Sequence, residues 1–170
     1  MEGNKKKYNK PRALLIFGAP CSGKSTFSEK FADKFGLAFY DFDKLKEEND
    51  FSDKALLVIL EQILKTKQNV IVEGAILNTE KERSEIRNML RGCGYEPALV
   101  WVQTDITTIR QRLKMKYRSV SKAKKAYDDA VSTIEAPSEI EHPIILSGKH
   151  TFETQTKHVL TGLADLGDVK

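Results

Sequence analysis

The sequence is poor in the residues that mark secreted, metal-binding and membrane-spanning proteins. Its 170 residues include only two cysteines, Cys21 and Cys93, which do not form a CxxC pair. We therefore expect no disulfide framework and take a reducing cytoplasm as the simpler location. The three histidines are scattered without metal-ligand spacing. No apolar run approaches the length of a membrane span, and the ALLIF run near the N-terminus is too short for a signal peptide.

What the sequence does contain is typical of one soluble domain. Charged residues make up 31% and hydrophobic residues 40%, and the length suits a single domain with a real core. The net charge of +4 permits an anionic ligand without implying nucleic acid. We expect residues 1–12, MEGNKKKYNKPR, to form a flexible basic tail and residues 13–170 to form the domain.

Apolar runs and amphipathic segments alternate along the chain. The expected strands are RALLIF, LAFYDFD, NVIVEG, PALVWVQT and PIILSG, at residues 12–17, 37–43, 69–74, 97–104 and 143–148. Helical spacing predicts helices over residues 25–36, 52–67, 78–94, 105–118 and 151–167. Because the strands are continuously apolar, both of their faces are buried. We predict an α/β three-layer sandwich with a five-stranded parallel sheet, from which residues 119–141 make an excursion.

One motif stands where the first strand ends. GAPCSGKST fits the phosphate-loop pattern G-x-x-x-x-G-K-[ST] between a predicted strand and a predicted helix. Glycines allow the loop to turn its N–H groups inward onto an anion, at the positive end of the following helix. We expect Lys24 to reach the β- and γ-phosphates and Ser25 to hold Mg²⁺. The expected nucleotide-binding residues are Gly18, Ala19, Pro20, Cys21, Ser22, Gly23, Lys24, Ser25 and Thr26.

Acidic residues end the second and third expected strands. Asp41 and Asp43 alternate on a predicted strand, so both would lie on one side of the sheet at its carboxyl edge. One could accept a proton from an attacking hydroxyl while the other holds water around Mg²⁺. A solvated strand end or a helix N-cap is the alternative. Glu73 follows an apolar strand where the Walker B pattern usually has Asp; it would support Mg²⁺ or face the substrate.

A basic stretch without any acidic residue runs from Arg110 to Lys125. Its cations are Arg110, Arg112, Lys114, Lys116, Arg118, Lys122, Lys124 and Lys125. Phosphoryl transfer spreads negative charge over the transferred oxygens, and mobile cations that close over them stabilise that charge. We therefore predict a basic helical lid at about residues 110–141. A solvated basic helix is the alternative interpretation.

With the loop, the DxD strand end and the basic helix in place, the chain resembles the small P-loop kinases of the adenylate-kinase-like fold. Within them it is similar to the AAA-domain group that contains polynucleotide 5′-kinases and zeta-toxin-like enzymes. Its first half also resembles gluconate and shikimate kinases. The resemblance covers Ala13 to Arg118 and implies a strand order of 2-3-1-4-5, with ATP and Mg²⁺ as cofactors. It makes Asp43 the carboxylate that activates the acceptor hydroxyl and Asp41 its neighbour on the Mg²⁺ side.

The resemblance also implies roles for cations near the nucleotide. Arg112 matches a lid arginine that contacts the nucleotide, and a second lid arginine would fall near Lys116 or Arg118. Lys149, in SGKH after the fifth strand, would lie near the base. Shikimate is disfavoured as a substrate, because no arginine that could clamp its carboxylate lies between Arg12 and Arg83.

We therefore predict an ATP- and Mg²⁺-dependent kinase that acts on a hydroxyl, with Lys24, Asp41, Asp43, Arg112 and Arg118 as catalytic residues and Ser25, Asp41 and Glu73 at the metal. The acid-free basic stretch favours a nucleic-acid 5′-hydroxyl slightly over a small metabolite; a nucleoside or nucleotide acceptor stays open. The alternatives are a small-metabolite kinase, a nucleotide-gated regulatory ATPase and a toxin acting on a sugar-nucleotide. We expect a monomer without a membrane partner.

Overall fold

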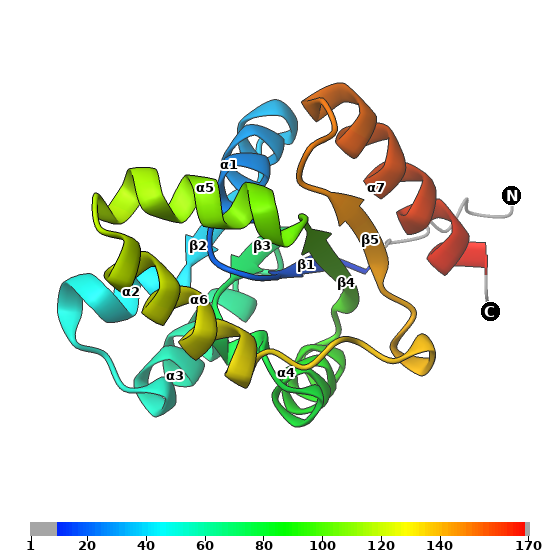
Figure 1. Ribbon diagram of the computed structural model, residues 1–170. Helices are drawn as coiled ribbons and strands as arrows, with labels where there is room; N and C mark the ends of the chain where they lie inside the picture. Colours follow the sequence, from blue (N-terminus) through cyan, green and yellow to red (C-terminus); the bar gives the residue numbers. More distant parts are fainter. Residues whose placement is uncertain (1–9, 169–170) are drawn as a thin grey trace, which may run out of the picture.

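A five-stranded, all-parallel sheet forms the middle layer of the computed structural model, in which residues 10–168 are described (Figure 1). Its strands are β1 (Arg12–Phe17), β2 (Ala38–Asp41), β3 (Val70–Glu73), β4 (Glu96–Gln103) and β5 (Ile144–Ser147). They are arranged in the order β2-β3-β1-β4-β5. This order confirms the one that the resemblance implied, and it places the carboxyl ends of all five strands at one edge of the sheet.

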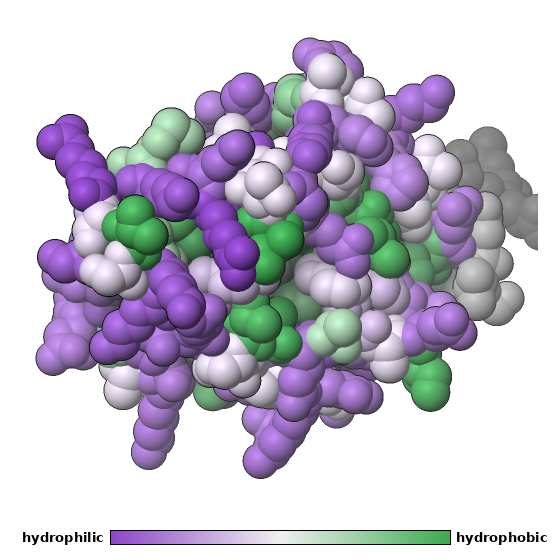
Figure 2. Space-filling model, in the orientation of Figure 1, coloured by the Kyte–Doolittle hydropathy of each residue, from purple (hydrophilic) through white to green (hydrophobic). Residues whose placement is uncertain are grey.

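Helices cover both faces of this sheet. They are α1 (Lys24–Phe35), α2 (Phe42–Asn49), α3 (Asp53–Leu64), α4 (Glu80–Gly92), α5 (Ile106–Tyr117), α6 (Val120–Thr133) and α7 (Phe152–Asp168), with 3-10 turns η1 (Ala75–Leu77) and η2 (Glu139–Glu141). Helices α1 and α7 lie on one face of the sheet and α3 and α4 on the other (Figure 1). Helices α5 and α6 pack against each other, and the face of the molecule that carries them mixes hydrophilic side chains with hydrophobic patches (Figure 2).

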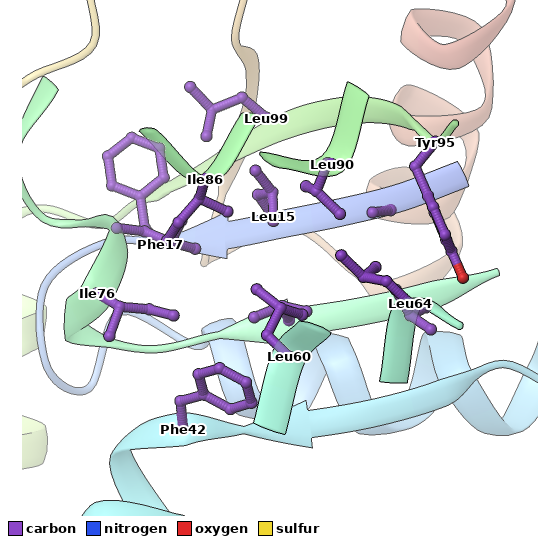
Figure 3. Packing of buried hydrophobic residues seen from close by; sticks show 14 of the residues in the cluster. Leu15, Phe17, Phe42, Leu60, Leu64, Ile76, Ile86, Leu90, Tyr95 and Leu99 are labelled. Carbon is purple, nitrogen blue, oxygen red and sulfur yellow. The ribbon is translucent and has the colours of Figure 1, made fainter. Parts of the chain in front are cut away.

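The side chains of β1 show why both faces of the sheet had to be covered. Leu14 and Ile16 pack in the cluster of α1 and α7, whereas Leu15 and Phe17 pack in the cluster of α3 and α4 (Figure 3). All four are at most 3% exposed. Each side chain of this size contributes about 1.5–3 kcal/mol when fully buried. The continuous apolar run of this strand thus holds both outer layers on the sheet.

Local caps set the ends of several helices. Ser52 accepts a hydrogen bond from the Ala55 N–H at the start of α3, and Asp105 accepts one from the Thr108 N–H at the start of α5. Gly36 ends α1 in the left-handed conformation, with φ of +63°. These three signals were readable from the sequence, because short polar side chains satisfy free N–H groups at helix starts and glycine adopts positive φ at helix ends.

The second strand is shorter than the sequence suggested. We predicted a strand through Asp43, with Asp41 and Asp43 alternating on it, and this was wrong. The strand ends at Asp41, whose side chain accepts a hydrogen bond from the Lys44 N–H and caps α2. Phe42 is only 1% exposed, so its burial in the core draws the chain into the helix at once. Asp43 therefore lies in the first turn of α2.

The chain after α6 is fastened to the loop after β3 by a buried arginine. Arg83 is fully buried; its Nε and Nη2 donate to the two carboxylate oxygens of Glu141 at 2.8 and 2.9 Å. Its Nη1 donates to the backbone carbonyls of Leu77, Asn78 and Glu135. The guanidinium also lies 4.7 Å from the ring centre of Phe17. Arg83 thereby fixes where the excursion returns to the sheet.

Some predictions concern parts of the chain that the structure describes only partly. Residues 1–9 of the predicted basic tail lie outside the described residues. Among residues 10–168, no helix combines the length and the apolar character needed to cross a membrane. Cys21 and Cys93 are both free, in agreement with the expectation that no disulfide holds the fold.

Candidate active site

The loop between β1 and α1 adopts a conformation that depends on glycine. Gly18 has φ of +151°, and a β-carbon there would overlap the backbone carbonyl of Val102. Gly23 caps α1 with φ of +104°, so no side chain caps the first N–H groups of the helix. Cys21 also has positive φ, +59°, which is uncommon for a side-chain-bearing residue. The loop therefore presents main-chain donors at the positive end of a helix, a geometry suited to an anion.

A cavity of about 420 Å³ opens directly in front of this loop. Its wall combines the loop and start of α1, the inner side of α5 and the connection from β5 to α7. The polar members of this wall are Lys24, Ser25, Thr26, Lys30, Arg112, Lys116, His150 and Gln155. The structure thus brings together the predicted loop residues and Arg112, although they come from distant parts of the chain.

Arg112 joins the three segments that surround the cavity. Its Nη1 donates to the Cys21 carbonyl at 3.0 Å, and its Nη2 donates to the Gly148 carbonyl at 3.3 Å. Nearby, the Thr104 hydroxyl donates to the Ser22 carbonyl at 2.8 Å. The residue after β4 and helix α5 are therefore bonded to the phosphate-type loop, and Arg112 links the connection after β5 to it. This places the Arg112 guanidinium on the wall of the cavity, and the nucleotide contact that the resemblance implied for it stays a prediction.

Glu73, at the end of β3, lies beneath the loop and not in the open cleft. Its Oε1 accepts a hydrogen bond from Ser25 Oγ at 2.5 Å, and its Oε2 accepts one from Ser28 Oγ at 2.8 Å. The residue is 1% exposed, and burial raises the pKa of its carboxyl, against the effects of the Ser25 bond and the Lys24 charge. The sequence left open whether Glu73 faces a substrate; its burial behind Ser25 does not fit that alternative.

Asp41 and Asp43 lie beside Glu73 at the same edge of the sheet. Asp41 is paired with Glu73 in the β2–β3 register, and its charge adds to the rise in the Glu73 pKa. Asp43 Oδ1 accepts a hydrogen bond from the Ala75 N–H at 2.6 Å. This bond spans the Gly74 turn, where φ is +146° and a β-carbon would come within 3.2 Å of Asp43 Oδ1. Backbone geometry after β3 thus fixes the Asp43 carboxylate.

The remaining predicted cations occupy different positions. Lys116 lines the cavity, whereas Arg118 is exposed and ends α5 with φ of +50°. Lys149 Nζ is 2.5 Å from Asp105 Oδ2, and it lines a separate cavity of about 780 Å³ beside Trp101 and Tyr127. Bonds from Lys149 and Thr108 hold the pKa of Asp105 well below its usual range. Lys149 therefore pairs with Asp105 and does not line the cavity in front of the phosphate-type loop.

Several residues of the site were missed from sequence. Ser28 follows Ser25 by three positions on α1, so the two hydroxyls share a helix face, and this spacing could have predicted their common partner. His150 and Gln155 reach the cavity only because the β5–α7 connection folds against the loop. No local sequence pattern predicts such a contact.

Comparisons with known proteins agree with this fold. Residues 14–137 match the family model described as an AAA domain. Among solved structures, a gluconokinase from Sinorhizobium meliloti 1021 superposes with a TM-score of 0.68 at 19% identity, covering 93% of this chain and 94% of that one. No curated protein matches the sequence.

Two further solved structures hold ligands. Kti12 of Chaetomium thermophilum, in complex with ADP-AlF3, has a TM-score of 0.68 at 16% identity, covering 91% of this chain and 98% of that one. The APS kinase CysC of Mycobacterium tuberculosis, in complex with AMPPNP and APS, has a TM-score of 0.64 at 17% identity, with coverage of 91% and 98%. At these identities the likeness shows the fold, which is that of the P-loop kinases.

Proposed function

The chain belongs to the AAA domain family, and we propose that it is an ATP- and Mg²⁺-dependent kinase that transfers the γ-phosphoryl group to a hydroxyl. The observation behind this proposal is that the phosphate-type loop and the Asp43 carboxylate lie at the same edge of the sheet. Lys24 and Ser25 stand at the start of α1, on the wall of the cavity. The Asp43 carboxylate is fixed by the Ala75 N–H at the end of the adjoining strands.

The nucleotide would bind at the loop of residues 18–26. The main-chain N–H groups and the positive end of α1 would hold its phosphates, with Lys24 on the β- and γ-phosphates. Arg112 would contact the nucleotide from α5, since its guanidinium lies on the cavity wall. Two structures of the same fold hold ADP-AlF3 and AMPPNP, which supports nucleotide binding by this chain.

The donors around Ser25 fit Mg²⁺, which prefers oxygen ligands and is usually held by few protein groups together with phosphates. Among the described residues, no three His, Cys, Asp or Glu side chains gather as a metal cage, so the phosphates would complete the coordination. Ser25 would bind the ion directly, with Glu73 orienting its hydroxyl and Asp41 acting through water. When bound, Mg²⁺ would neutralise charge that develops on the β- and γ-phosphate oxygens.

Asp43 would take the proton from the attacking hydroxyl. Its Oδ1 is already occupied by the Ala75 N–H, so this bond orients the carboxylate. The charge on the transferring group would be stabilised by Lys24 at the start of α1. Lys116 and Arg118, at the end of α5, would add to this from the lid formed by α5 and α6. Such cations act by position, because the loose transition state offers little covalent chemistry to the protein.

Among acceptors we favour a nucleic-acid 5′-hydroxyl. The basic side chains of α5 and α6 that support this choice are exposed: Arg110, Lys114, Lys116, Arg118, Lys122, Lys124 and Lys125. A row of exposed cations beside a phosphoryl-transfer site would hold the phosphates that follow a 5′ end. A small metabolite is the second candidate, supported by the shared fold of the gluconokinase.

The test is transfer of labelled γ-phosphate from ATP to 5′-hydroxyl oligonucleotides or to a pool of sugar acids and nucleosides. We expect transfer to the oligonucleotide, with binding that weakens steeply as salt rises. Asp43→Asn should keep ATP binding and lose transfer, whereas Asp50→Asn, at the exposed end of α2, should keep both. Transfer by Asp43→Asn at the wild-type rate would remove Asp43 from the role of base, and hydrolysis without transfer to any acceptor would favour the regulatory ATPase.

A further inference from the structure

A second positively charged cavity lies at the opposite edge of the sheet. Its volume is about 370 Å³, and it is formed by the starts of β1 and β4 together with α4 and α7. The cationic residues that line it are Lys10, Arg12, Arg87 and Arg91, with His142 beside them. Among the described lining residues the only acidic one is Glu96.

This cavity is separate from the candidate active site. Arg12 begins β1 and Phe17 ends it, immediately before the phosphate loop. A strand of that length spans roughly 17–20 Å at about 3.3 Å per residue. A ligand in the cavity would therefore not share groups with a nucleotide at Lys24. The inference does not depend on the function proposed above.

Arg87 is the cation of this cavity that has a buried N–H donor without a hydrogen-bond partner in the described part of the chain. It is half-buried on α4, and its Nε is buried without any hydrogen-bond partner. Two of its charged neighbours, Arg91 and Arg83, are also cations; burial and these charges lower the pKa of Arg87. The acidic neighbour is Glu141, whose two oxygens already accept bonds from Arg83 and from the Ser138 N–H. The charge of Arg87 is thus left poorly compensated.

The neighbouring guanidinium groups lie around the same space and make few bonds to the described residues of the protein. Arg12 Nη1 donates to the Leu163 carbonyl at 2.8 Å, and its Nε lies 3.8 Å from Glu96 Oε2. Arg91 Nη1 donates to Asn88 Oδ1 at 3.4 Å. Each of these groups has further N–H donors, because a guanidinium carries five. Guanidinium forks recognise phosphate oxygens in pairs, which flexible surface lysines do not.

We propose that this cavity binds a phosphate-bearing anion through Arg12, Arg87 and Arg91, with Lys10 at its rim. The volume accommodates one or two phosphate groups, and an anion there would offset the accumulated positive charge. The phosphate could be free, as in pyrophosphate, or belong to a nucleic-acid backbone; the chemistry of recognition is the same.

The first experiment measures thermal unfolding of the full chain against inorganic phosphate and pyrophosphate. A Lys24→Ala background weakens the phosphate loop equally in all samples. Within that background we expect the Tm to rise with the logarithm of anion concentration, as for a ligand that binds only the native state. Arg87→Gln/Arg91→Gln should lose most of this rise, while the control Lys54→Gln/Lys65→Gln, on and beside α3, should keep it. An equal rise in all three proteins, or none, would overturn the proposal.

A second measurement separates ligand binding from a structural role of Arg87. In anion-free buffer, Arg87→Gln should have a Tm equal to or above that of wild type, since the buried Nε of Arg87 has no hydrogen-bond partner within the described residues and the substitution removes a half-buried cation beside Arg83 and Arg91. A clear fall in Tm in that buffer would mean that Arg87 stabilises the fold, and would count against an anion site.

The source of the phosphate is distinguished by competition. Labelled pyrophosphate is bound first, and a short single-stranded oligonucleotide without a 5′-phosphate is added. Displacement that weakens with salt and requires Arg87 and Arg91 assigns the site to a nucleic-acid backbone. Retention of pyrophosphate assigns it to a free anion. Both results support the site, and binding of pyrophosphate that is indifferent to Arg87 and Arg91 contradicts it.

Discussion

The Ser25 hydroxyl donates a 2.5 Å hydrogen bond to Glu73, and the Glu73 carboxylate is almost fully buried behind it. A second hydroxyl, that of Ser28, occupies the other carboxylate oxygen. Both carboxylate oxygens of Glu73, at the end of β3, therefore bind hydroxyls of α1, the helix whose first residues line the candidate active site. This relationship explains how Glu can stand where Asp is usual: the longer side chain reaches two hydroxyls on one face of α1.

Replacing Glu73 by Gln tests the role of this carboxylate at the metal. The amide can keep bonds to both hydroxyls, but it removes the negative charge behind Ser25. We expect Mg²⁺-nucleotide affinity to fall about 10- to 100-fold, the range typical when a residue that orients a metal ligand is lost. Nucleotide binding without Mg²⁺ should change little. Calorimetry with and without the metal separates the two; equal losses in both would mean that Glu73 only supports the loop.

The buried carboxyl also predicts a dependence of stability on pH. Burial raises the folded-state pKa of Glu73 above the ordinary value of 4.5. A raised pKa contributes stability that is fully present below the unfolded value and is lost as the pH rises through the folded value. In metal-free buffer, the free energy of unfolding of Glu73→Gln should therefore increase relative to that of wild type as the pH rises above 4.5. Parallel curves from urea denaturation at several pH values would contradict the raised pKa.

Gly74 should matter to transfer more than to nucleotide binding. Its φ of +146° disfavours any side chain, and a β-carbon would press on Phe42 Cβ at 3.0 Å and on Asp43 at 3.2 Å. Gly74→Ala should cost about 1–3 kcal/mol in backbone strain and displace the Asp43 carboxylate. We expect a lower kcat for transfer with nucleotide affinity retained. The control is Gly92→Ala at the end of α4, where a β-carbon meets nothing within 4 Å.

Arg83 and Glu141 form a buried pair whose members depend on each other. Burial alone would raise the pKa of Glu141, but the bonds from Arg83 and the Ser138 N–H leave it below its usual value. Arg83→Met leaves the carboxylate without its partner and should destabilise the protein by about 3–5 kcal/mol. Arg83→Met/Glu141→Met should recover part of that loss in chemical denaturation. If the double variant is as unstable as the sum of the single ones, the two side chains act independently.

The sequence predicted the sheet well because its signals there are local. The apolar run from Ala13 to Phe17 is buried on both faces, as its continuity required. The caps Ser52 and Asp105 also follow from a residue and its next turn. The end of β2 was predicted too late in the chain. The burial of Phe42 and the cap at Asp41 end the strand, but the alternation of Asp41 and Asp43 looks the same as in a strand that continues.

The candidate site was predicted in its parts but not in its connections. The glycine-lysine pattern located the loop, because its chemistry lies in consecutive residues. The spacing of Ser25 and Ser28 on α1 indicates that they share a partner, whereas the bonds of Arg112 to Cys21 and Gly148 are tertiary contacts that no spacing in the sequence encodes. The same holds for Lys149, which pairs with Asp105 across the ends of β4 and β5.

The most direct test is calorimetric titration of Mg²⁺-AMPPNP into the wild-type chain and into Lys24→Ala, with Lys54→Ala as the exposed control. If the loop at the start of α1 holds the triphosphate, the wild type and the control bind with the same affinity, and Lys24→Ala binds at least tenfold more weakly. Absence of binding to the folded wild-type chain, or equal affinity in all three proteins, would contradict the account.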